Sequence, residues 1–203
     1  MRAFAGDMQS VAVPWMNHFA MEQGLMRELV RSAKSGDPAA FERLVIIHER
    51  TVLRVAQRLL LNSEDAKDAA QEAFIRLHRS LRNFEEDREL GPWLYRVTVN
   101  ICRDVARRSR RSVCLGEAES VESKERGPEA AAVAAQQKRM IVAAIAALTQ
   151  REREIIVLRD LEGRSTKEIA GIVGACEGTV RSHLSAGRVK IKNHIAGLLR
   201  KQP

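Results

Sequence analysis

The sequence predicts an all-α protein with two small helical domains joined by a flexible linker, the second containing a helix-turn-helix. Three observations lead to this prediction. Apolar residues recur at helical spacing through most of the chain, and no segment alternates as a strand would. The 203 residues suffice for one large or two small domains. Hydrophobic residues make up 45% of the chain but aromatic residues only 4%, so the core must be mainly aliphatic, which suits packed helices.

The chain is expected to begin with an extension over residues 1–24 and to form its first domain over residues 25–111. Periodicity in the extension is weak, and Pro14 and Gly24 interrupt it. We therefore expect the extension to be disordered.

A Ser-Gly-Asp-Pro run at residues 35–38 separates the first two helices of the first domain. Gly36 favours a helix end, Asp37 favours an N-cap, and Pro38 suits the first position of the next helix. A long apolar stripe then follows over residues 41–60.

Two further helices are predicted in the same domain. One opens at residues 62–65, with acidic residues in its first turn, where the helix dipole favours them. A polar, charged loop over residues 82–92 separates it from a helix over residues 93–111. The last turns of this helix are rich in arginine, which suits contacts with phosphates.

Residues 112–134 are expected to form the linker, and residues 135–203 the second domain. The linker segment loses periodicity and gains Gly, Pro, Ser and Glu, followed by alanines. It is acidic, whereas basic residues dominate on both sides and give the chain a net charge of +8 and a pI near 9.9. A chain with this balance favours a polyanionic partner.

The clearest motif lies in the second domain, after helices over residues 130–148 and 151–161. Ser165 and Glu168 have the spacing of a capping box, and Gly174 stands where the first short helix must stop. Residues 177–182 open the next helix and face away from its apolar stripe. This pattern favours a helix-turn-helix whose second helix enters the DNA major groove, with an ordinary helical hairpin as the alternative.

The sequence shows no pattern typical of a metal site, a membrane helix or a signal peptide. The three cysteines, Cys102, Cys114 and Cys176, have no metal-binding spacing, and the histidines are isolated. No apolar run approaches the length of a membrane helix, and no signal peptide is evident. We expect a cytoplasmic protein without a metal or cofactor.

Three motifs resemble the sigma-70 family of bacterial RNA polymerase subunits. Residues 65–74 (DAKDAAQEAF) resemble the DAxDxxQExF helix of sigma region 2, and residues 91–108 resemble the WLYRIAxNxxxDxxRR helix that follows it. Residues 148–154 and the helix-turn-helix resemble sigma region 4. The order of the motifs, with no region 3 between them, is similar to the small extracytoplasmic-function group.

The resemblance implies a subunit without catalysis of its own that binds core RNA polymerase and promoter DNA, with an anti-sigma factor as a further partner that could hold it at the membrane. An exposed acidic and amide face of region 2 would dock on the coiled coil of the largest polymerase subunit. Its residues are Asp65, Asp68, Gln71 and Glu72.

The resemblance also implies that region 2 reads and opens the −10 element. A stacking surface for an extruded base would come from Trp93, for which the core is the alternative, and from Phe84 in its polar loop. Asn100 could bond a base or the backbone. The arginines suited to phosphates are Arg103, Arg107, Arg108, Arg110 and Arg111.

Region 4 would read the −35 element through the start of its second helix. Arg181 is the strongest candidate for a base or phosphate contact, beside Glu177, Thr179, Ser182 and His183. Arg188, Lys190 and Lys192 are expected to follow the DNA backbone. Two positions depart from the family pattern: Cys176 should cap the helix weakly, and Gly187 should cost on the order of 1 kcal/mol within it.

Two other functions compete with this interpretation. A self-sufficient regulator would bind a palindromic duplex operator as a dimer without polymerase. A helical enzyme would need a nucleophile–base pair, metal spacing or phosphate loop, and none is evident in the sequence.

Overall fold

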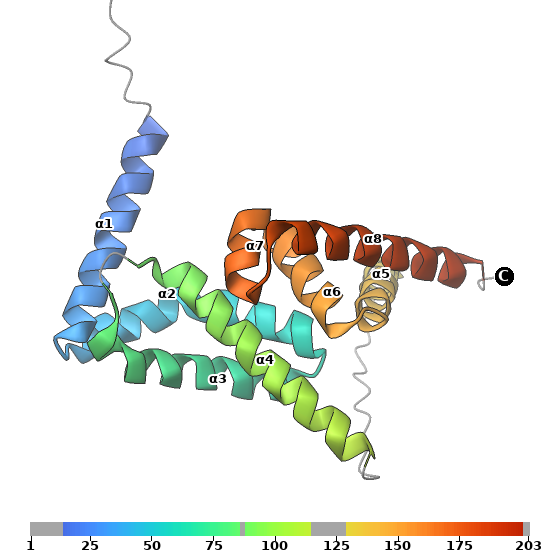
Figure 1. Cartoon of the computed structure of the whole chain (residues 1–203), viewed down its shortest axis with the longest axis horizontal. Coiled ribbons are helices and arrows are strands. Elements are labelled where there is room, and N and C mark those ends of the chain that lie inside the picture. Colours follow the sequence, from blue (N-terminus) through green and yellow to red (C-terminus); the bar gives the residue numbers. More distant parts are fainter. Residues whose placement is uncertain (1–13, 86–87, 115–128, 201–203) are drawn as a thin grey trace, which may run out of the picture.

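The computed structural model describes residues 14–85, 88–114 and 129–200, and these residues form helices and short connections without any strand. The predicted all-α class is confirmed. The helices form two groups that lie side by side, one from each half of the chain (Figure 1).

The first domain is a bundle of four helices in which α2 packs against all three others. Its interior is aliphatic, with Leu44, Val55 and Leu77 fully buried. The elements are α1 (Pro14–Lys34), α2 (Pro38–Leu60), α3 (Ser63–Ser80), a 3₁₀ turn (Leu81–Asn83) and α4 (Leu90–Cys114).

The predicted signals at the helix ends are confirmed. Gly36 has a φ of 95°, in the left-handed region that favours glycine. The Asp37 side chain accepts a hydrogen bond from the Ala39 amide at 2.9 Å and caps α2. Asn62 caps α3 in the same way.

The start of α1 differs from the prediction, which placed the first helix at Leu25. The helix begins at Pro14, so residues 14–24 are helical. Proline is tolerated in the first turn of a helix, and Gly24 inside one costs only about 1 kcal/mol, so neither residue needs to interrupt it. Residues 1–13 lie outside the described residues.

The second domain packs α8 against α5, α6 and α7. Thr149 and Glu152 form a capping box at the start of α6. The elements are α5 (Glu129–Ala146), α6 (Gln150–Ile156), a π-helical turn (Val157–Leu161), α7 (Thr166–Val173) and α8 (Glu177–Leu199).

The helices on both sides of the expected linker are longer than predicted. Because α4 continues to Cys114 and α5 begins at Glu129, both ends of the 112–134 segment are helical. Residues 115–128 lie outside the described residues. The two domains meet directly, because α7 packs on α4 and the π-helical turn packs on α2.

Candidate polymerase and DNA interfaces

The turn between α7 and α8 has the geometry of a helix-turn-helix. The Ser165 hydroxyl accepts from the Glu168 amide at 3.2 Å, and the Glu168 carboxylate accepts from the Ser165 amide at 2.7 Å. Hydrogen bonding of its carboxylate to Ser165 lowers the pKa of Glu168. Gly174 ends α7 in the left-handed region, with a φ of 67°. The capping box and the glycine stop are therefore confirmed.

The leading turns of α8 separate a buried face from an exposed one. Val180 and Leu184 are buried, whereas Thr179, Arg181 and Ser182 are exposed. His183 is half-buried. The predicted DNA-facing side of this helix is thus accessible at its N-terminal end.

Glu177 organises this exposed face. Its carboxylate oxygen Oε2 accepts from the Arg181 guanidinium and from the Thr166 hydroxyl, both at 3.2 Å. Since Thr166 belongs to α7, Glu177 connects the two helices of the motif and holds the Arg181 side chain along α8.

Cys176 occupies the N-cap position of α8 without forming a side-chain capping hydrogen bond, as expected for a weak cap. Its sulfur lies 3.1 Å from the Thr179 hydroxyl oxygen. This hydrogen bond is the main cause of the lowered pKa of the exposed thiol. Cys102, by contrast, is buried in the first domain, and burial raises its pKa to about 12.

Arg188 and Lys190, which are expected to follow the DNA backbone, form ion pairs within the second domain. Arg188 donates to both oxygens of Asp160, at 3.1 and 2.5 Å, and Lys190 donates to both oxygens of Glu152, at 2.7 and 2.9 Å. Packing of α8 on α6 brings Glu152 to Lys190. Lys192 is exposed.

The packing of α8 on α6 also explains why a glycine stands at position 187. A β-carbon at this position would lie 3.0 Å from Cγ1 and 3.3 Å from Cδ1 of Ile156. Ile156 is only 3% exposed. Glycine lowers the helix propensity at this position, but its missing side chain allows α6 and α8 to approach closely.

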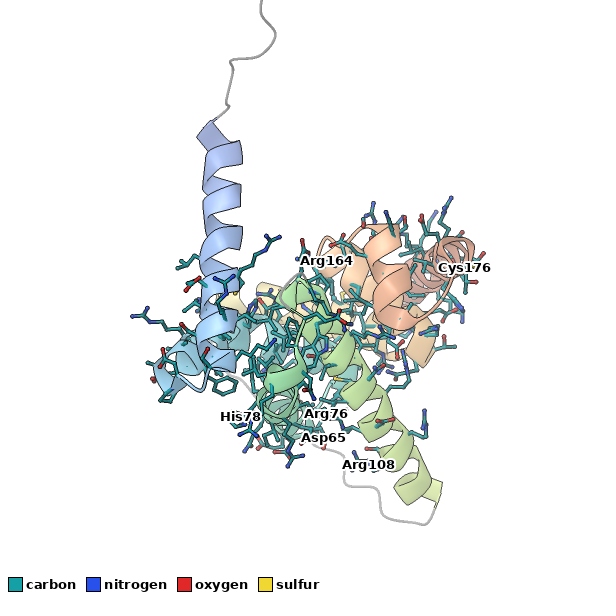
Figure 2. The ribbon with its side chains drawn as sticks, turned by 60° about the vertical axis from the view of Figure 1, so that its left-hand side comes forward. Asp65, Arg76, His78, Arg108, Arg164 and Cys176 are labelled. Carbon is teal, nitrogen blue, oxygen red and sulfur yellow. The ribbon has the colours of Figure 1, made fainter. Side chains whose placement is uncertain are left out.

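The arginine-rich end of α4 is exposed in part. Arg107 and Arg108 face solvent; Arg107 forms an ion pair with the Asp104 carboxylate at 3.8 Å, and Arg108 donates to the Asp104 backbone carbonyl at 3.4 Å. The side chains of Arg110 and Arg111 lie outside the described residues. Figure 2 shows Arg108 on the free lower half of α4, away from the second domain.

Arg103 differs from the other arginines near the end of α4, because it forms an ion pair with a residue of the second domain. Its guanidinium donates to both carboxylate oxygens of Glu154, at 3.1 and 2.7 Å, and to the side-chain oxygen of Asn100 at 3.1 Å. The Glu154 side chain is fully buried. Asn100 is thus the second acceptor of Arg103, and the role of both residues at the −10 element stays a prediction.

Phe84 is also corrected, since it is 4% exposed and belongs to the core. Its ring packs edge-to-face against Trp93, with centroids 5.7 Å apart. Trp93 is half-buried and lines a cleft of about 280 Å³ between the start of α4 and α7. The stacking candidate that retains access to solvent is therefore Trp93.

The acidic and amide face of α3 lies apart from the second domain. Asp68 and Gln71 are exposed, Asp65 is half-buried, and Glu72 accepts from Arg76 at 2.8 Å. Figure 2 shows Asp65 and Arg76 low on the first domain, far from Cys176 at the start of α8. The candidate polymerase-binding face and the candidate base-reading face thus lie on different sides of the molecule.

The residues that join the two domains were not predicted from the sequence. Glu162, after the π-helical turn, accepts from Arg54, Arg58 and Tyr95 of the first domain. Each of these residues is separated from Glu162 by more than 60 positions, and no local pattern marks the pairing. Gly187 did carry a signal, because a glycine inside a helix indicates a close approach.

Among the described residues, no group of three or more His, Cys, Asp or Glu side chains is arranged to hold a metal ion. Within the same ranges, no helix has the length and apolar character needed to cross a bilayer.

Comparison with known proteins matches both halves of the chain. The model of Sigma-70 region 2 matches residues 44–112, and the model of Sigma-70, region 4 matches residues 138–191. The chain is 34% identical over 190 residues to the ECF RNA polymerase sigma-E factor of Escherichia coli, covering 89% of this chain and 99% of that one. It is 32% identical over 184 residues to the RNA polymerase sigma-H factor of Pseudomonas aeruginosa, covering 86% and 95%.

Solved structures agree with this result. The structure of CnrH in complex with the cytosolic domain of CnrY shares 25% identity and a TM-score of 0.63, covering 88% of this chain and 99% of that one. The fold is also shared with RpoE of Bartonella quintana, solved with the anti-sigma factor NepR, at 21% identity, a TM-score of 0.61 and coverage of 80% and 98%. With both region models in order and relatives matched over nearly their whole length, the chain belongs to the sigma-70 family, in its extracytoplasmic-function group.

Proposed function

We propose that this protein binds core RNA polymerase and directs it to promoters with separate −10 and −35 elements. The observation that carries the proposal is the exposed leading face of α8. Thr179, Arg181 and Ser182 point to solvent there, while Val180 and Leu184 anchor the helix in the second domain. A helix held in this way can enter the major groove with its N-terminal residues against the base edges.

The −35 contact would rest chiefly on Arg181. A guanidinium can donate two hydrogen bonds to a guanine edge, and Glu177 can accept from cytosine. Because Glu177 and Arg181 are paired at 3.2 Å in the free protein, both side chains already lie on the side that would meet the DNA.

The −10 contact would rest on α4. Arg107 and Arg108 offer positive charge to phosphates, and Trp93 offers a half-buried ring that lines the cleft. Removing a base from the duplex costs a few kcal/mol of unstacking, which an aromatic surface and a basic groove help to offset.

The polymerase contact would use the face of α3 formed by Asp65, Asp68, Gln71 and Glu72. Exposed carboxylates pair with basic groups on a partner and fix its orientation. The bond from Arg76 holds Glu72 in one position on this face.

The protein would contribute recognition and strand opening, with the polymerase supplying catalysis. It would act in the bacterial cytoplasm, where the core enzyme and DNA are present. Since RpoE is solved with an anti-sigma factor, an anti-sigma factor is the expected inhibitor of this protein too, and one with a membrane anchor would hold it at the membrane.

The test is in vitro transcription with purified core polymerase and a library of genomic promoter fragments. We expect the protein to direct initiation at a discrete set of fragments that share two sequence elements. Transcription no different from that of core enzyme alone would contradict the proposal. Tight binding to a palindromic duplex without polymerase would instead indicate a self-sufficient regulator.

A further inference from the structure

Glu162 of the second domain occupies a carboxylate-binding site on the first domain. Its side chain is only 2% exposed. Oε1 accepts from Arg54 at 3.1 Å and from Arg58 at 2.5 Å, and Oε2 accepts from Arg54 and from the Tyr95 hydroxyl, each at 3.1 Å. The two arginines come from α2 and the tyrosine from α4, so this site exists only where those helices pack together.

Further polar contacts surround this carboxylate. Arg58 of the first domain donates to the Leu161 carbonyl of the second at 3.3 Å. Arg153 of the second domain donates to the Leu59 carbonyl of the first at 3.1 Å. The Arg164 guanidinium lies 4.8 Å from the centre of the Tyr95 ring. Figure 2 shows Arg164 at the boundary between the two domains.

We propose that Glu162 and its three donors form an autoinhibitory latch, which holds the free protein in a closed state with part of its −10 surface covered. The proposal rests on the function proposed above. The latch consists of Glu162 with Arg54, Arg58 and Tyr95, supported by the Arg103–Glu154 pair.

The closed state covers α4 in two ways. First, α7 packs on α4 and forms one wall of the cleft that contains Trp93, with Lys167 and Glu168 among the residues that line it. A promoter strand that approaches Trp93 from this side meets protein. Second, Arg103 directs Nε and Nη2 at the Glu154 carboxylate and Nη1 at Asn100, so a phosphate that took its bidentate face would have to displace a buried carboxylate.

The second domain is restrained in the same state. In a helix-turn-helix the first helix crosses the DNA backbone while the second lies in the groove. Here that first helix is α7, and it is packed on α4 (Figure 1). Binding of both domains to separated elements on one DNA therefore requires α7 to leave α4.

The chemistry of the contact suits a switch. Buried ion pairs add little net stability, because the loss of hydration nearly cancels their attraction. When the domains separate, water can solvate Glu162 and both arginines. Opening therefore leaves no charge that is both buried and without a partner. A partner that binds only the open state, such as core polymerase, can then shift the population.

The first test measures the distance between the domains in the full chain. A donor and an acceptor fluorophore are placed by non-cysteine chemistry at two exposed positions, Arg79 of α3 and Ser185 of α8. Glu162→Arg sets three positive charges together and should lower energy transfer. The charge-swapped variant Arg54→Glu/Arg58→Glu/Glu162→Arg should restore it.

A matched control carries the same change of charge outside the contact. Glu28 lies on the exposed surface of α1, where its partner is Arg31 three residues away. Glu28→Arg should leave energy transfer unchanged. If circular dichroism shows that Glu162→Arg is not folded, Arg54→Glu/Arg58→Glu replaces it as the opening variant, since both arginines are partly exposed.

The second test measures binding of the free protein to promoter DNA by fluorescence anisotropy at one salt concentration. The opened variant should bind at least tenfold more tightly than Glu28→Arg, which has the same net charge. If Arg54→Glu/Arg58→Glu stands in for Glu162→Arg, it should bind more tightly than the wild type despite its lower net charge.

Unchanged energy transfer in the opened variant overturns the latch. Opening without tighter DNA binding overturns autoinhibition. Since energy transfer does not depend on promoter recognition, failure of the proposed function would be seen separately, as transcription that never exceeds core enzyme alone.

Discussion

Replacing Arg181 by alanine should lower transcription from matched promoters without removing polymerase binding. Its side chain is 67% exposed, and its partner Glu177 lies one turn away on the same helix. An exposed pair of this kind contributes at most about 1 kcal/mol, so the fold should tolerate its loss. Helical structure by circular dichroism should remain that of the wild type.

The size of the effect follows from the contact that Arg181 can make. A bidentate hydrogen bond to one base is worth about 1–3 kcal/mol of discrimination. Since each 1.4 kcal/mol is a factor of ten, transcription from a matched promoter should fall roughly 5- to 150-fold. The truncated side chain should also relax the preference at one position of the −35 element.

The assay is run-off transcription on promoters varied only in the −35 element, with Lys192→Ala as the matched control. Lys192 lies three turns further along α8 and is exposed. Its loss should weaken all promoters alike and reduce the salt dependence of binding. If Arg181→Ala keeps both the strength and the ranking of the wild type across the set, the assigned role of Arg181 is wrong.

Three further substitutions test the docking face of α3, the contact between α6 and α8, and the cap of α7. Asp68→Arg, on the exposed face of α3, should weaken retention of core polymerase in a pull-down while leaving the fold intact, because it sets like charges against a basic partner; retention at wild-type strength would contradict the docking face. Gly187→Ala should lower the free energy of unfolding by about 1 kcal/mol in urea denaturation, since crowding against Ile156 outweighs the gain in helix propensity; a more stable variant would show that Ile156 can move. Ser165→Ala removes the cap of α7 and should also cost about 1 kcal/mol by the same measurement, whereas an unchanged midpoint would mean that Glu168 alone holds the turn.

Local chemistry made the helix boundaries of the motif predictable. Ser165, Glu168 and Gly174 act through atoms within a few residues of each other, so their spacing alone predicted the turn. The outward face of α8 followed from the apolar stripe in the same way. Those two features contain most of the candidate −35 site.

Contacts between distant segments were not predictable from one sequence. Glu154 stands among alternating Arg and Glu residues, a pattern that suits an exposed helix, yet it is fully buried because α4 lies over it. Phe84 has polar neighbours along the chain but lies against Trp93 in space. Each of these outcomes depends on tertiary packing, which outweighs local propensity.

The most direct test of promoter recognition by two domains is a footprint of the reconstituted holoenzyme on one promoter, with permanganate probing of unpaired thymines. We expect two separate protected blocks and reactive thymines near the downstream block, both dependent on core polymerase. Protection of a single symmetric duplex site by this protein alone, without reactive thymines, would contradict it.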